Sequence, residues 1–219
     1  MKEHRMIINK QKTKVIAFKK SKKWDFPPEM TFSDGTHVEC VSSVRLVGVT
    51  LSQDLKWSEK TRLICEKARR KLWILRRMQA LELNEWQLFY VYYIKEIRSI
   101  LEMAVPVWHS SLTKIQSKEI EKVQKIALKL ILKHNYVSYD LACKKFNTVT
   151  LEERRTQLCY RFASKNLKSD HSYFTKLVKN VNTRNKIGSI TVKEIKCNFD
   201  RYRKSSIPYL ANLLNTYKK

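Results

Sequence analysis

The stretch RLICEKARRKLWILRRM, residues 62–78, decides the fold of this 219-residue chain. Its apolar residues recur at steps of three and four, which is the spacing of one buried stripe along an α-helix. The stripe consists of Ile64, Ala68, Leu72, Leu75 and Met78. Most of the remaining positions are Arg or Lys. The stretch therefore predicts an amphipathic helix with an apolar face toward the core and a strongly basic face toward solvent.

Helical patterns continue after this stretch. Three pairs have the spacing of a capping box, in which a polar side chain opens a helix and a residue three positions later caps it in return. These pairs are Asn84 with Gln87, Thr113 with Gln116, and Thr150 with Glu153. With the periodicity they predict helices over about 84–105, 113–134, 138–146, 150–162 and 208–214. Residues 170–203 are mixed and polar and indicate no clear element.

Before residue 56 the pattern is strand-like. Residues 14–18 are a short apolar, β-branched run, and residues 37–40 and 44–51 also indicate strands, while Asp34-Gly35 is a turn dipeptide. The run 44–51 is almost continuously apolar, so we expect one strand buried on both faces. Gly48 inside it indicates a bulge or a close backbone approach. With only three Gly and four Pro in the chain, the pattern predicts an α+β fold that is mostly α.

The charge of the chain calls for an anionic partner. Forty-five Lys and Arg oppose twenty Asp and Glu, which gives a formal charge of +25. The phosphate backbone of nucleic acid is the usual partner of such a surface, an anionic membrane surface is the main rival, and a merely soluble basic protein is the third explanation. A disordered basic tail is excluded, because 43% of the residues are hydrophobic and 11% aromatic.

Several other classes of protein fit poorly. Five widely spaced cysteines without a Cys-x-x-Cys pair indicate reduced thiols in an intracellular protein, nuclear or cytoplasmic, and no zinc-site spacing occurs. The most apolar stretch, residues 88–108, contains four charged residues, so a bilayer helix is not expected there.

The candidate binding residues lie mainly on the helix of residues 62–78. Arg69 and Arg70 precede Arg76 and Arg77 by about two turns, which returns the two pairs to one side of the helix. Arg62 precedes them on the same helix. Contact with about six phosphates would give a salt slope near −5 on a duplex and would position it without reading sequence. A solvated basic face is the alternative.

A loop tryptophan is a further candidate. Trp24 adjoins a cluster of four lysines within residues 19–23 and could stack on a base. A tryptophan in a loop more often covers an edge of the hydrophobic core.

A series of short motifs runs along nearly the whole chain. In order they are MIIN at 6–9 with KTKVIAF at 12–18, VRLVGV at 44–49 with LKW at 55–57, IRSILEMAVPVW at 97–108, IEKVQKIAL at 120–128, LEERR at 151–155 and SIPYL at 206–210. Together they resemble the C-terminal part of the reverse transcriptase of non-LTR (LINE-like, jockey-type) retrotransposons. Val47 and Met103 depart from the residues usual in that family, Leu and Tyr.

The resemblance implies three regions and two further sites. Residues 1–55 would be a small antiparallel β remnant at the end of the palm, 56–134 a thumb-like helical bundle and 135–219 a C-terminal helical region. Lys12 and Lys14 would lie beside the incoming nucleotide, and residues 46–49 would form a primer grip. That grip consists of Leu46, Val47, Gly48 and Val49. A solvated strand face for the lysines and a packed strand for residues 46–49 are the structural alternatives.

The resemblance also implies what is lacking. The family's polymerases hold two Mg²⁺ ions on carboxylates that include a Tyr-Ala-Asp-Asp hairpin, whereas this sequence contains no Asp-Asp pair. We therefore expect no catalytic residue, no metal ligand and no cofactor, and no enzyme activity from this chain alone. Its expected role is non-specific binding of template and primer, RNA or DNA, with no membrane partner. The missing palm, or another chain, would cover the β remnant.

Two alternative interpretations fit the same residues. One is a stand-alone basic helical module that binds RNA, DNA or a partner protein. The other is a transposon remnant without function, because strands deprived of the rest of their sheet have unpaired edges.

Overall fold

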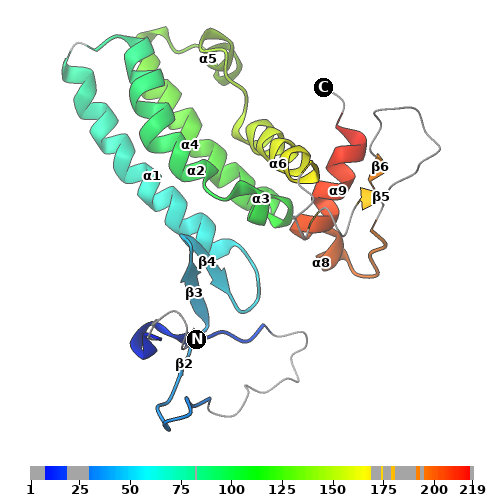
Figure 1. Cartoon of the computed structure of the whole chain (residues 1–219). Coiled ribbons are helices and arrows are strands. Elements are labelled where there is room, and N and C mark those ends of the chain that lie inside the picture. The colour runs from blue at the N-terminus through cyan, green and yellow to red at the C-terminus, as the bar shows by residue number, and fades with distance from the viewer. Residues whose placement is uncertain are drawn as a thin grey trace. The chain divides into compact units, whose positions relative to one another are not determined.

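The structure is a computed structural model that describes residues 8–18, 30–81, 83–168, 174, 179–180, 191–192 and 195–217. The fold is α+β and mostly α, as the sequence predicts (Figure 1). The chain divides into two compact units, residues 1–60 and 61–219. The two helical regions expected at 56–134 and 135–219 thus fall almost wholly within the second unit.

The N-terminal unit contains short strands. The strand β1 (Lys14–Val15) pairs in parallel with β2 (Glu39–Cys40), whereas an antiparallel remnant is expected from the sequence. A parallel pair needs a long connection, which residues 16–38 provide. The expected turn at Asp34-Gly35 is confirmed, because the Gly35 N–H donates to the Phe32 carbonyl over 3.0 Å and Gly35 has a φ of 81°.

The prediction of a single strand over 44–51 is wrong. Residues 43–52 form an antiparallel hairpin of β3 (Ser43–Leu46) and β4 (Val49–Ser52). Val47 and Gly48 make its two-residue turn, with φ values of 47° and 78°. Two successive positive φ values define the type I′ turn, whose twist matches the strands of a hairpin. Gly48 is therefore a turn residue, and Val47 lies in a backbone region that a β-branched residue rarely adopts.

Helix α1 (Ser58–Met78) confirms the amphipathic helix that opens the second unit. Ile64, Ala68, Leu72 and Leu75 of the predicted stripe are buried, and Met78 is half-buried. The next helix runs along α1, because the Tyr92 hydroxyl donates to the Lys71 carbonyl over 3.0 Å. An ion pair of 2.7 Å between Lys71 Nζ and Glu96 Oε2 joins the same two segments.

This second long segment is π-helical over Gln87–Arg98 and continues as α2 (Ser99–Glu102). Its start confirms the predicted capping box, since the Gln87 N–H donates to Asn84 Oδ1 over 2.9 Å and the Asn84 N–H to Gln87 Oε1 over 3.2 Å. The buried side chains recur at steps of four and five, which suits the wider turn of a π-helix. They are Leu88, Phe89, Tyr92, Tyr93 and Ile97. A short helix, α3 (Val105–Trp108), follows after Ala104 at a φ of 54°.

Helix α4 (Lys114–Leu132) begins at the predicted Thr113–Gln116 capping box and leads to α5 (Tyr139–Lys145) and α6 (Leu151–Leu167). Glu121 of α4 accepts hydrogen bonds from the Leu151 and Glu152 N–H groups at 3.0 and 3.2 Å. A carboxylate at the N-terminus of α6 is favoured by the helix dipole. Thr150 is the N-cap of α6, as predicted, with its hydroxyl 3.2 Å from the Glu153 N–H.

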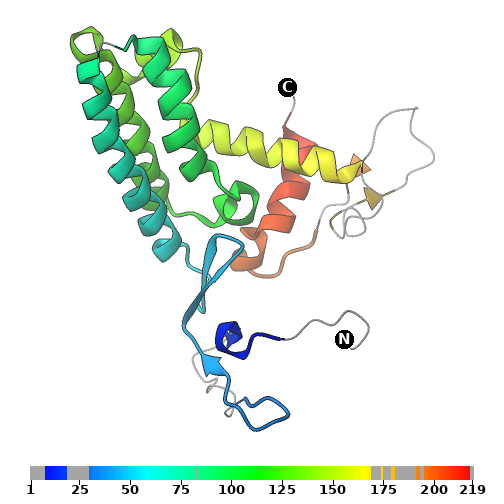
Figure 2. The same cartoon turned by 60° about the vertical axis from the view of Figure 1, so that its left-hand side comes forward.

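Helix α9 (Ser206–Thr216), near the C-terminus, packs against α6. The final elements are α8 (Asp200–Arg203) and α9, together with the two-residue strands β5 (Lys179–Asn180) and β6 (Thr191–Val192), which pair antiparallel. Helices α6 and α9 lie side by side in both views (Figures 1 and 2). In the part of the chain that the structure describes, none of the helices combines the length and the apolar composition of a bilayer span.

Among the described residues of this unit, one charged side chain is fully buried. Arg155 of α6 has 0% exposure and donates from Nε to His109 Nδ1 over 3.3 Å and from Nη2 to Ser117 Oγ over 2.7 Å. Burial, and then the charge of Arg155, lowers the pKa of His109 to about 4. The guanidinium thus ties α6 to the start of α4 and to the turn after α3, while it keeps His109 neutral.

Candidate nucleic-acid interface

Helix α1 exposes a tryptophan framed by arginines. Arg69, Arg70, Arg76 and Arg77 are all exposed, as the spacing of the two pairs predicts. Trp73 stands three or four positions from each of them, so its side chain lies among theirs on the helix surface. Its exposure is 55%, and the Arg77 guanidinium lies over its ring at 4.2 Å from the centroid. An exposed indole surrounded by cations offers a stacking surface for a base beside contacts for phosphates.

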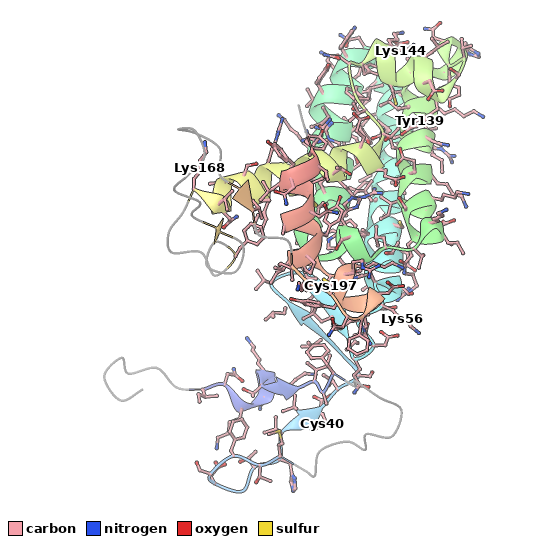
Figure 3. The ribbon with its side chains drawn as sticks, turned by 90° about the vertical axis from the view of Figure 1, so that its right-hand side faces the viewer. Cys40, Lys56, Tyr139, Lys144, Lys168 and Cys197 are labelled. Carbon is pink, nitrogen blue, oxygen red and sulfur yellow. The ribbon has the colours of Figure 1, made fainter. Side chains whose placement is uncertain are left out.

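Helix α4 adds a row of lysines. They lie on the side opposite its buried residues and follow the spacing i, i+4, i+7, i+11, which keeps them on one face. The row consists of Lys118, Lys122, Lys125 and Lys129, all exposed. Lys125 Nζ lies 5.0 Å from the centroid of the Tyr139 ring, at the start of α5. Figure 3 labels Tyr139 and Lys144, both of α5, near one end of the bundle.

The arginines of α1 and the lysines of α4 belong to one surface. Glu119 of α4 joins them, because it binds Arg69 Nη2 at 3.1 Å with one oxygen and Lys122 Nζ with the other. Gln79, just after α1, donates to the Leu130 carbonyl of α4, so the two helices run side by side in the same direction (Figure 2). We call this surface the α1–α4 basic face. It comprises Arg69, Arg70, Trp73, Arg76, Arg77, Lys118, Lys122, Lys125 and Lys129.

The ion pairs within the α1–α4 basic face are weak enough to be exchanged. The hydrogen bond from Lys122, and then the charges of Lys122 and Arg69, lower the pKa of Glu119. Exposed ion pairs contribute little to stability, so a phosphate can take the place of this carboxylate at little cost. Among the residues that the structure describes, Arg70 and Arg76 have no acidic partner.

Three further predicted cations are not counted in the α1–α4 basic face. Arg62 pairs with Glu66 on α1 at 2.6 Å. Lys12 and Lys14 belong to the N-terminal unit, where Lys14 pairs with Glu39 at 2.9 Å and Lys12 is exposed. Trp24 lies outside the described residues.

The four residues proposed as a primer grip form the tip of the β3–β4 hairpin. Leu46 and Val47 are exposed, Val47 by 93%, whereas Val49 is buried at the start of β4. Their side chains thus divide between solvent and the interior. The turn presents backbone and two apolar side chains rather than cations.

Sequence reasoning missed Trp73 and the lysine row of α4. Both have a signal in the sequence. Trp73 lies at helical spacing from all four arginines, and the four lysines avoid the apolar stripe of their own helix. Within the described part of the chain, no three His, Cys, Asp or Glu side chains are grouped as metal ligands would be.

Comparison with known proteins adds no residue to this site. No family model, curated protein or solved structure matches the chain. The function of the α1–α4 basic face is therefore argued from its own geometry and charge.

Proposed function

We propose that this chain binds RNA or DNA through its phosphate backbone at the α1–α4 basic face and does not read sequence there. The observation that carries the proposal is the arrangement of eight cations around one exposed tryptophan and one carboxylate, Glu119. Lys and Arg bind phosphate by displacing condensed counterions, which requires many cations on one accessible surface rather than a shaped pocket. Trp73 adds a platform on which an unpaired base can stack.

The motif series supports a more specific proposal. The chain would be the thumb and following helices of a non-LTR retrotransposon reverse transcriptase, holding template and primer while the catalytic carboxylates and their Mg²⁺ reside elsewhere. In that role the α1–α4 basic face grips the duplex. Lys12 and Lys14, with the hairpin tip at 46–49, would contribute nearer the polymerase centre. The chain by itself would bind and not catalyse.

A pair of double variants tests the proposed surface. R70Q/R76Q removes two arginines of the α1–α4 basic face that have no acidic partner in the described structure. R161Q/K165Q removes two exposed cations of α6 and is the matched control for net charge. Affinity for a fluorescent duplex is measured by anisotropy at one fixed salt concentration, with two duplexes of unrelated sequence.

R70Q/R76Q is expected to weaken both duplexes equally, by about tenfold or more, since charge-assisted contacts contribute about 1.5–3 kcal/mol each. The α6 variant should stay close to the wild-type affinity. Equal losses of affinity in the two double variants would show that only net charge matters, and would refute the assignment of binding to the α1–α4 basic face. A loss confined to one duplex would refute backbone binding.

A further inference from the structure

A separate open pocket lies between the π-helical segment, the loop after α5 and the first turns of α6. Its volume is about 380 Å³, within the range of small-molecule sites. Tyr90, Ile94 and Arg98 follow one another at steps of four along the π-helical segment, while Arg154 and Gln157 line it from α6. None of these residues belongs to the α1–α4 basic face.

One end of the pocket is a fixed aromatic surface. The Phe89 and Phe146 rings stack with centroids 4.3 Å apart, and Tyr90 stacks on Trp86 at 5.4 Å with planes 3° apart. The Tyr90 hydroxyl donates to the Phe146 carbonyl over 3.1 Å, which holds the ring against the loop. Tyr90 remains 42% exposed. A planar, apolar ligand can therefore stack on the exposed part of the Tyr90 ring.

The other end carries an excess of positive charge. Arg98 and Arg154 donate from their Nε atoms to the same oxygen, Glu102 Oε1, at 3.3 and 2.9 Å. Two guanidinium groups thus share one carboxylate, so the group has a net charge of +1. Both arginines line the pocket, with side chains 15% and 22% exposed. A guanidinium that binds Glu102 through Nε has further N–H donors with which it can bind an anion such as phosphate.

The loop between these two ends is polar. Asn147 follows the C-cap of α5 with a φ of 46°, the left-handed conformation in which asparagine often ends a helix, and the Thr148 N–H donates to the Cys143 carbonyl over 2.9 Å. Asn147 and Gln157 both line the pocket, and a side-chain amide can both donate to and accept from the edge of a nucleobase. The long π-helical segment that forms the opposite wall is itself rare, and π-turns are frequent at functional sites.

From this arrangement we infer that the pocket binds one nucleotide unit, with its base on Tyr90 and its phosphate at Arg98 and Arg154. The ligand is either a free nucleoside monophosphate or one nucleotide of a single strand, since both present the same base and phosphate. The inference goes beyond backbone binding at the α1–α4 basic face and does not depend on it.

Calorimetric titration of the full chain tests this inference. The titrants are AMP, UMP, adenosine, inorganic phosphate and the dinucleotide ApA. We expect AMP and UMP to bind, and adenosine and phosphate to bind at least about tenfold more weakly, because each engages only one end of the pocket. Tighter binding of ApA than of AMP would assign the pocket to a strand, and the reverse order to a free nucleotide.

Variants locate the binding. R154Q and Y90L should each weaken AMP binding about tenfold or more. R161Q removes an arginine two turns further along α6, and both this variant and R70Q/R76Q should leave AMP binding unchanged. Q157A is the second variant should R154Q fail to fold, and it is expected to weaken AMP severalfold. Absence of mononucleotide binding at millimolar concentration would overturn the inference. Binding that Y90L and Q157A leave intact while R70Q/R76Q abolishes it would do so as well, and would assign the nucleotide to the α1–α4 basic face.

Discussion

Trp73 is the residue at which a stacking contribution can be separated from a purely ionic one. Replacement of Trp73 by alanine should lower the affinity for single-stranded DNA or RNA about 5- to 150-fold, because stacking of a base on an aromatic ring contributes about 1–3 kcal/mol. A duplex should lose much less, since its bases already stack on one another. Anisotropy titrations of both forms at equal salt measure the difference. I74A, which trims another exposed apolar side chain of α1, is the control, and equal losses on single strand and duplex would contradict stacking.

Glu119 gives a prediction of the opposite sign. Glu119→Gln removes the carboxylate that competes with phosphate for Arg69 and Lys122, so nucleic-acid affinity should rise about three- to tenfold at low salt. E96Q breaks a similar exposed pair with Lys71 on the side of α1 that faces the π-helical segment and should change affinity less. The idea fails if E119Q binds no more tightly than the wild type, or if both variants gain equally.

His109 should make stability dependent on pH. Its folded pKa of about 4 lies below the ordinary 6.5, so the unfolded chain takes up the proton first as the pH falls. The contribution of neutral His109 to the free energy of unfolding is therefore complete above pH 6.5 and is lost as the pH falls toward 4, on the order of 3 kcal/mol in all. In urea unfolding between pH 7 and 4, the free energy of unfolding should fall less for H109N than for the wild type. Replacement of the exposed His134 provides the control, and parallel profiles for wild type and H109N would disprove the assignment.

The residues of the candidate site differ in how far the sequence foretells them. The exposure of Arg69, Arg70, Arg76 and Arg77 follows from helical spacing alone, because all four avoid the apolar stripe. The contact between His109 and Arg155 joins residues 46 positions apart, and no local period encodes it. The lysine row of α4 follows from its spacing, but its position beside α1 follows from two contacts, Arg69–Glu119 and Gln79–Leu130, that join residues distant in sequence.

At the scale of elements, helix starts are more predictable than the strands. The capping pairs at Asn84, Thr113 and Thr150 lie where the structure begins its helices, because a cap is a local interaction between near neighbours. The sequence of Gln87–Arg98 does not distinguish a π-helix from an α-helix, since a step of four to five differs little from an α-helical step over so short a segment. The sequence predicts one strand over 44–51 instead of the hairpin at 43–52, because Val-Gly lacks the usual Asn-Gly or Asp-Gly turn signal.

This hairpin predicts a stabilising substitution. Val47 occupies a positive φ of 47° with 93% exposure, so Val47→Asn should relieve about 1 kcal/mol of backbone strain without loss of packing. Amide hydrogen exchange of β4 in the full chain should slow accordingly, by about fivefold. V47I keeps the branched side chain and should bring no protection. Unchanged exchange in V47N would mean that the turn does not have the positive φ values of this structure.

At the scale of the whole molecule, the main features are the high positive charge and the division into two units. The second unit, residues 61–219, holds the long helices, the α1–α4 basic face and the nucleotide pocket. Among the described residues of the N-terminal unit, Val49 and Trp57 are the buried hydrophobic side chains. Composition foretells a mostly helical, basic chain. Composition does not foretell the division at residue 60 or the parallel pairing of β1 with β2, because both arise from contacts distant in sequence.

We propose that the α1–α4 basic face of this +25 chain binds several phosphates at once. The most direct test is the slope of log affinity against log salt concentration for the wild-type chain on a duplex, with R70Q/R76Q measured beside it. Contact with about six phosphates predicts a slope near −5, and the double variant should be less steep by about 2. A wild-type slope near zero, or a slope that R70Q/R76Q leaves unchanged, would contradict the account.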